Sequence, residues 1–166
     1  MKETTEKNLI DAFAGESQAH VKYAVFADRA EREGLANVAR LFRAASYSEQ
    51  IHATNHLKAL GLGKTPENLE VALSGETFEI TTMYPDYMQA AEEDDEKRAL
   101  SSMHAANEAE KVHAALYARA KETVAAGADI AVVAIFVCPV CGYTMEGEAP
   151  ERCPVCNAPS SKFLEF

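Results

Sequence analysis

The sequence contains two copies of a Glu-x-x-His pair, at residues 49–52 and 110–113. Residues three apart lie on the same face of an α-helix, so each copy directs a carboxylate and an imidazole toward one point. A glutamate that follows a glycine stands upstream of each copy, Glu16 in the first half of the chain and Glu76 in the second. The step along the chain from Glu16 to Glu76 is nearly the same as the step from one pair to the other. This spacing predicts two copies of a helical hairpin, each carrying three groups that can bind a metal.

Hydrophobic periodicity predicts four helices in the first 126 residues. Apolar stripes with steps of three and four run over residues 9–30, 38–59, 69–90 and 103–124. Each predicted ligand lies on an inward stripe, where an unpaired buried carboxylate would be very costly. One Glu from each of two helices and one Glu-x-x-His from each of the other two are typical of ferritin-like di-iron bundles. We therefore predict an all-α, ferritin-like four-helix bundle over residues 1–128; the alternative, that the glutamates face water, requires stripes misphased in four helices at once.

The expected ligand set contains four carboxylates and two imidazoles. Sites rich in oxygen and imidazole favour iron or manganese over zinc, whose structural sites prefer thiolates. By the symmetry of the repeat, the glutamates of the two pairs should bridge two metal ions, and the upstream glutamates should be terminal ligands. The predicted ligands are Glu16, Glu49, His52, Glu76, Glu110 and His113.

The two halves differ at one position that matters for the chemistry. Glu79 follows Glu76 by one helical turn, whereas its counterpart in the first half is Ala19. A third carboxylate on one side predicts two metal ions with different coordination; the alternative is a glutamate on the helix surface. Pro85 lies in the same predicted helix and should bend it just beyond the metal.

Two tyrosines and one histidine also lie on these stripes. Tyr23 and Tyr84 follow their glutamates by seven and eight residues, about two turns. They are candidates to donate hydrogen bonds to ligand carboxylates, or else ordinary core residues. His20 is predicted to fill its stripe rather than to support a ligand.

All four cysteines lie near the C-terminus as two Cys-x-x-Cys pairs, and residues 129–166 are predicted to form a small β domain around them. Two such pairs predict one tetrahedral four-sulfur metal site, and their spacing does not decide between iron and zinc. Gly142 and Asn157, which follow the pairs, tolerate the left-handed conformation that directs amide N–H groups at sulfur. A short strand is expected within residues 130–137. The predicted ligands are Cys138, Cys141, Cys153 and Cys156.

The link between the second and third helices is short. In a ferritin-like bundle these helices are parallel, so the link must climb about 30 Å. About six extended residues, the stretch from Gly61 to Pro66, reach only about 20 Å. We therefore expect the two hairpins of one bundle to come from different chains, exchanged in a homodimer.

Composition excludes several partners. The net charge of −10 argues against nucleic acid and anionic membranes. No apolar run approaches the roughly 18 residues of a membrane span, and the N-terminus does not have the pattern of a signal peptide. Cysteines paired for metal binding rather than for disulfides favour a reducing, cytoplasmic location.

With these motifs the chain resembles the rubrerythrin family over nearly its whole length. The resemblance depends most on Gly75-Glu76-x-x-Glu79 with Met83-Tyr84-Pro85, followed by the cysteine pairs. It implies a C-terminal rubredoxin-like domain holding one iron, with zinc as a possible substitute. It further implies a non-haem peroxidase that reduces hydrogen peroxide to water, with NAD(P)H-derived electrons arriving through a separate reductase or rubredoxin and passing to the di-iron site.

The resemblance also implies roles for individual residues. Glu79 would hold one iron in the oxidised protein, and this iron would move toward His52 on reduction. Tyr23 and Tyr84 would donate hydrogen bonds to the ligand carboxylates. Two rival functions remain open on the residues alone: a ferroxidase or iron-storage protein, and a structural bundle with a zinc ribbon.

Overall fold

The computed structural model describes residues 1–131 and 133–166. Val132, which falls within the strand predicted for residues 130–137, lies outside the described residues. The chain forms two compact units, Met1–Leu62 and Gly63–Phe166. The predicted domain boundary between residues 128 and 129 falls inside the second unit and stays a prediction.

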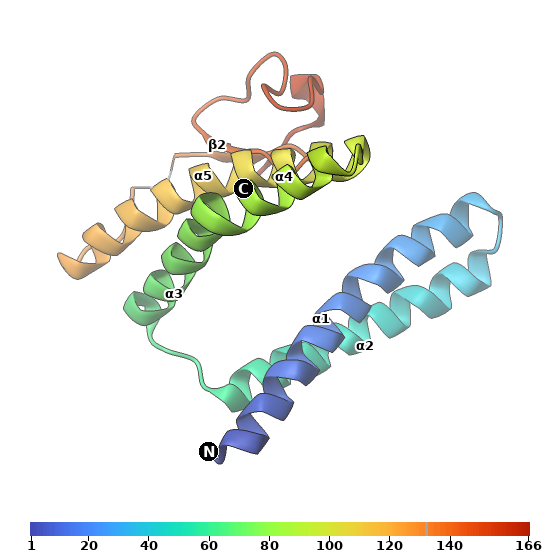
Figure 1. Ribbon diagram of the computed structural model, residues 1–166, viewed down its shortest axis with the longest axis horizontal. Helices are drawn as coiled ribbons and strands as arrows, with labels where there is room; N and C mark the ends of the chain where they lie inside the picture. Colours follow the sequence, from blue (N-terminus) through green and yellow to red (C-terminus); the bar gives the residue numbers. More distant parts are fainter. Residues whose placement is uncertain (132) are drawn as a thin grey trace. The chain divides into compact units, whose positions relative to one another are not determined.

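The first unit is an antiparallel helical hairpin (Figure 1). Helix α1 spans Glu3–Arg32 and helix α2 spans Ala36–Leu60, with Gly34 at φ 77° in the turn. Small side chains let the two helices pack closely, while many large apolar side chains of the hairpin remain exposed. The buried residues are Ala27, Ala30, Ala39, Ser46 and Ala53.

The second unit begins with another hairpin, in which one arm is interrupted. Helix α3 (Thr65–Phe78) passes into a π-helical turn, η1 (Glu79–Met83), and then into α4 (Tyr84–Glu93). Helix α5 (Lys97–Ala125) packs against all three. None of the described helices is long and apolar enough to cross a membrane.

The π-helical turn ends just before Pro85. Pro85 has no N–H group and cannot bond to the carbonyl four residues earlier. Just before it, the N–H of Tyr84 donates to the carbonyl of Glu79, five residues back, which is the π-helical pattern. The distortion expected at Pro85 takes this form, and the helix axis changes direction between α3 and α4 in Figure 1.

The chain ends in a small antiparallel sheet with strand order β2-β1-β3. The strands are β1 (Ile135–Val137), β2 (Thr144–Glu146) and β3 (Leu164–Glu165), with a 3₁₀ turn, η2, at Ser160–Lys162. We call residues 135–166 the cysteine module, because its buried core is built around Cys138 and Cys153. The predicted fold class, helices followed by a small β metal-binding module, is confirmed, whereas the exchange of hairpins stays a prediction.

Candidate metal centres

The first half-site consists of Glu16 on α1 and of Glu49 and His52 on α2. Their ligand atoms all lie within 4.8 Å of one another. The Nδ1 atom of His52 is 2.9 Å from a carboxylate oxygen of Glu49 and 3.9 Å from one of Glu16. The other ring nitrogen of His52 makes no hydrogen bond to any described residue, and the side chain is 50% exposed. Only one edge of this ring is therefore held.

The second half-site repeats this arrangement with Glu76 on α3 and with Glu110 and His113 on α5. The Nδ1 atom of His113 is 2.6 Å from an oxygen of Glu110 and 3.8 Å from one of Glu76. Burial, together with the nearby carboxylate of Glu110, raises the pKa of Glu76 to about 7. Burial and mutual repulsion therefore disfavour the charged carboxylates when no cation is present, and a bound metal ion would offset that repulsion.

A threonine of the cysteine module holds the second edge of the His113 ring. The Nε2 atom of His113 lies 2.8 Å from the Thr144 hydroxyl oxygen, which lies 3.1 Å from the carbonyl oxygen of Gly142. An ion pair between Arg119 of α5 and Glu146 of β2 joins the same two elements. The cysteine module therefore contacts the second half-site within one unit. No sequence motif indicated Thr144.

Glu79 and Tyr84 lie beside the second half-site. Burial raises the pKa of Glu79, the carboxylate of Glu110 raises it further, and His113 lowers it. Burial and the carboxylates of Glu79, Glu110 and Glu76 likewise raise the pKa of Tyr84. The structure thus brings both residues to the carboxylate cluster, although Glu79 is not one of the three residues whose ligand atoms lie within 4.8 Å.

The π-helical turn explains why Tyr84 follows its glutamate by eight residues and Tyr23 by seven. Seven residues are about two turns of α-helix, so Tyr23 lies on the same face as Glu16. An eighth residue would rotate the side chain by about 100° in an α-helix. A π-helical turn contains about one residue more than an α-helical turn, so η1 accommodates the extra residue and returns Tyr84 to the face of Glu76.

Tyr23 has different surroundings. Its ring packs 6.2 Å from that of Phe26 and 6.1 Å from that of Phe42, between ring centroids, and its hydroxyl bonds to no described residue. A hydrogen bond from Tyr23 to a ligand stays a prediction. The neighbouring His20 does more than fill its stripe, because its Nδ1 atom lies 2.8 Å from the carbonyl oxygen and 3.0 Å from the hydroxyl oxygen of Ser46 on the other helix.

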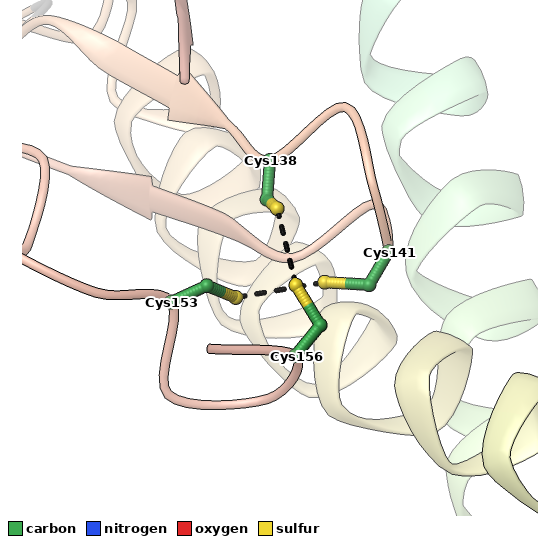
Figure 2. A group of neighbouring side chains, drawn as sticks. All are labelled: Cys138, Cys141, Cys153 and Cys156. Atoms are coloured by element: carbon green, nitrogen blue, oxygen red, sulfur yellow. Dashed lines mark hydrogen bonds between the residues drawn. The ribbon is translucent and has the colours of Figure 1, made fainter. Parts of the chain in front are cut away.

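The four cysteines converge on one point (Figure 2). The sulfur atoms of Cys138 and Cys156 are 3.6 Å apart, and those of Cys141 and Cys153 are 3.5 Å apart. Four sulfurs at about 2.3 Å from one central ion form a tetrahedron with edges of about 3.8 Å. All four cysteines are free thiols rather than disulfides. The cluster therefore fits one tetrahedral ion.

The turns after each cysteine pair have the predicted left-handed conformation. Gly142 has φ 82° and Asn157 has φ 62°, which confirms the expectation drawn from their positions. The amides two residues after Cys141 and Cys156 donate hydrogen bonds to the sulfurs. Such contacts stabilise thiolate charge and tune the potential of a bound metal.

The thiol pKa values indicate the same kind of site. Burial raises the pKa of Cys141 to about 12. For Cys138 burial also acts upward, but hydrogen bonds from the amides of Val140 and Cys141 and from the thiols of Cys156 and Cys141 together outweigh it and lower the pKa to about 7. Four thiolates cannot coexist here at neutral pH without a cation, because each would repel the others. A metal ion deprotonates its thiol ligands outright and removes this conflict.

The donor sets fit iron at both kinds of centre. Carboxylates with imidazoles suit a non-haem di-iron site, and four thiolates suit a single rubredoxin-type iron, for which zinc can substitute. A helical chain with paired carboxylate–imidazole half-sites and such a cysteine module defines a ferritin-like di-iron protein with a rubredoxin-like domain. A family model described as rubrerythrin matches residues 7–121, and one described as the rubrerythrin rubredoxin-like domain matches residues 136–164. The chain belongs to the rubrerythrin family.

Its relatives match it over nearly the whole length of both chains. Rubrerythrin-2 of Clostridium acetobutylicum is 38% identical, and the match covers 95% of this chain and 94% of that protein. Nigerythrin of Nitratidesulfovibrio vulgaris is 33% identical over 98% of this chain and 87% of its own length. A solved structure of nigerythrin in a mixed-valence state covers 100% of this chain and 88% of the nigerythrin chain, with a TM-score of 0.56 and 32% identity.

Proposed function

We propose that this protein reduces hydrogen peroxide to water at a di-iron centre, with electrons delivered through the iron of the cysteine module. The reaction consumes one peroxide, two electrons and two protons and yields two water molecules. The observation that carries the proposal is the bond between the module's Thr144 and the ligand His113, because it attaches a redox-capable site to the carboxylate centre. Solved states of nigerythrin include a partially reduced form and a fully reduced, all-ferrous form, which supports redox chemistry in a relative.

Different residues of the chain are proposed to have different roles at the di-iron site. Glu16, Glu49 and His52 of one half-site and Glu76, Glu110 and His113 of the other would hold the two ions, and by the symmetry of the repeat Glu49 and Glu110 would be shared between them. When bound, the two ferrous ions supply one electron each, so that no radical is released. The Tyr84 hydroxyl is protonated at neutral pH, and burial with the nearby carboxylates raises its pKa further, so Tyr84 can donate a hydrogen bond beside the centre.

Glu79 and His52 make the site asymmetric. In the proposed function Glu79 would hold one ion in the oxidised protein, and His52 would replace it as a ligand of that ion in the reduced protein. Two observations support this exchange of ligands. Glu79 stands in a π-helical turn, a distortion frequent at functional sites. The ring of His52 is held at one edge only, so it can adjust as an ion approaches.

The complete centre needs two half-sites, and we propose that an exchanged homodimer supplies them. Helix α2 runs on from Glu49 to Leu60, and α3 runs from Thr65 before it reaches Glu76. Each of these stretches is about three helical turns, so parallel helices would place the two ends of the link about 33 Å apart. Residues 61–64 form the whole link and span at most about 18 Å. The exposed apolar side chains of the first hairpin also fit burial against a second copy.

The electron donor is proposed to be a separate NAD(P)H-linked reductase or a rubredoxin, acting in the cytoplasm. The cysteine module would be the entry point, because a single iron held by its four thiolates accepts one electron at a time. Two deliveries then restore the di-iron centre after each peroxide.

The function is tested on protein of measured iron content, reduced without oxygen and then mixed with peroxide or with oxygen. We expect fast oxidation by peroxide and slower oxidation by oxygen. Faster oxidation by oxygen with formation of a mineral would support iron storage instead, and a colourless zinc protein unreactive toward both would support a structural role. Cys141→Ala is the matched variant: it should keep the first turnover with peroxide and lose the later ones, because re-reduction through the module fails.

A further inference from the structure

His113 differs from His52, the other predicted histidine ligand, because both of its ring nitrogens have hydrogen-bonding partners. Its Nδ1 edge faces the carboxylates of Glu76 and Glu110, while its Nε2 atom meets the hydroxyl of Thr144 at 2.8 Å. Thr144 is itself buried, at 5% exposure, and lies 3.1 Å from the carbonyl oxygen of Gly142. These contacts form a continuous chain of hydrogen bonds from the ligand to the turn that follows Cys141.

A metal bound at Nδ1, the ring nitrogen that faces the carboxylates, would fix the direction of this chain. The proton of the imidazole must then be on Nε2, because the lone pair of Nδ1 is used by the metal. Nε2–H donates to the Thr144 oxygen, and the Thr144 hydroxyl donates its only proton to the carbonyl of Gly142. Every donor has one acceptor, so the arrangement with metal bound is unique. Ligand histidines commonly depend on a partner of this kind for their orientation.

We propose that Thr144 is a positioning residue that holds His113 in the metal-binding tautomer and thereby makes the cysteine module serve the half-site of its own chain. The inference rests on the proposed metal site but not on peroxide as the oxidant. His52, whose Nε2 atom bonds to no described residue, has no such restraint. The restraint therefore belongs to the half-site that contacts the module.

A simple docking role for Thr144 is the main alternative. Arg119 and Glu146 form a second contact between α5 and β2 that does not involve the imidazole. Glu146→Gln weakens the same junction and leaves the ring's partner in place, so it is the matched control. Thr144→Val removes the hydroxyl at nearly constant volume, and Thr144→Ser restores it.

The test uses the full chain with all sites filled by Zn²⁺, which is diamagnetic. In the unmodified protein, nuclear magnetic resonance should show a slowly exchanging Nε2–H proton on His113, close to the side chain of Thr144. Thr144→Ser and Glu146→Gln should retain this signal, and Thr144→Val should lose it, while the signals of His52 stay unchanged. Transfer of Zn²⁺ from the carboxylate centre to a chelator should show an affinity weakened about 10- to 100-fold in Thr144→Val alone.

Several results would overturn the proposal. One is an unmodified protein whose His113 binds Zn²⁺ but shows no protected Nε2–H proton near Thr144; this measurement needs no variant to fold. Another is a Thr144→Val protein with unaltered Zn²⁺ affinity, and a third is a Glu146→Gln protein with the same loss. If the unmodified protein does not bind metal at His113, the proposed function fails together with the role of Thr144. If it binds metal there without a protected Nε2–H proton, only the role of Thr144 fails.

Discussion

The two half-sites contain the same three ligand types but differ in what surrounds them. In the first, His52 is 50% exposed and held at one edge, and the position matching Glu79 is Ala19. In the second, His113 is 30% exposed and held at both edges, and Glu79 and Tyr84 stand beside the carboxylates. The comparison shows that the two imidazoles are restrained to different extents, His113 at both ring edges and His52 at one.

The same contrast extends one turn away from the ligands. Ser46 and Asn107 occupy equivalent positions, each three residues before the glutamate of its pair, and both are buried. Ser46 bonds to His20 across the hairpin. Among the described residues, the Oδ1 atom of Asn107 has no hydrogen-bond partner, and the counterpart of His20 is Ile80. The first hairpin thus joins its helices by polar bonds, whereas the second uses the cysteine module to restrain its ligand.

The largest expected effect comes from placing the two half-sites on different chains. A chain with Glu49→Ala and His52→Ala, and another with Glu110→Ala and His113→Ala, should each lose the di-iron centre as homodimers. An exchanged heterodimer of the two contains one centre with both halves intact. Co-expression should therefore restore about a quarter of the normal iron content and peroxide turnover at random pairing. No restoration, despite formation of heterodimers, would refute the exchange.

A smaller effect is expected from making the halves alike. Glu79→Ala copies Ala19 into the second half and should slow peroxide turnover by about 10- to 100-fold while leaving the iron content nearly unchanged. The reciprocal change, Ala19→Glu, adds a carboxylate to the first half. Combined with Glu79→Ala, it should not restore peroxide turnover. The measurements are stopped-flow oxidation and metal analysis on the same samples. Unchanged turnover in Glu79→Ala would remove this residue from the mechanism.

The pKa of Glu76 predicts a pH dependence for the metal-free protein. Folding raises this pKa from 4.5 to about 7, so the folded protein keeps a proton that the unfolded chain releases in this range. The free energy of unfolding should therefore fall as pH rises from 4.5 to 7 and then level off. Thermal unfolding at a series of pH values checks this. Glu76→Gln should flatten the fall, and an equally steep fall in that variant would assign it to other groups.

The smallest expected effects concern Ser46 and Asn107. Ser46→Ala removes hydrogen bonds to His20 and should destabilise the protein by about 1 kcal/mol, lowering Tm by about 2–4 °C. Asn107→Leu replaces an unpaired buried carbonyl by an apolar group of similar size, so Tm should stay constant or rise. Calorimetry of both metal-free variants gives the comparison. A Tm loss in Asn107→Leu as large as that in Ser46→Ala would show that Asn107 has a partner.

Sequence reasoning predicted the features that depend on local spacing. The Glu-x-x-His pairs and the glutamates upstream of them predicted six candidate ligands, which the structure brings together in two groups of three, and the residues after each cysteine pair predicted the left-handed turns at Gly142 and Asn157. It could not predict Thr144, because the contact with His113 joins residues 31 apart in sequence and no motif marks it. Pro85 indicated a distortion in the third helix, but the form of the distortion depends on backbone bonding that composition does not reveal.

The π-helical turn also bears on how the two hairpins are related to each other. If both hairpins descend from one duplicated segment, they have come to differ by one residue between glutamate and tyrosine, and in the second hairpin the five residues of η1 accommodate the difference. Those five residues begin with Glu79, the acid that the first hairpin lacks. The extra residue and the extra acid, whose counterpart in the first half is Ala19, therefore lie in the same turn.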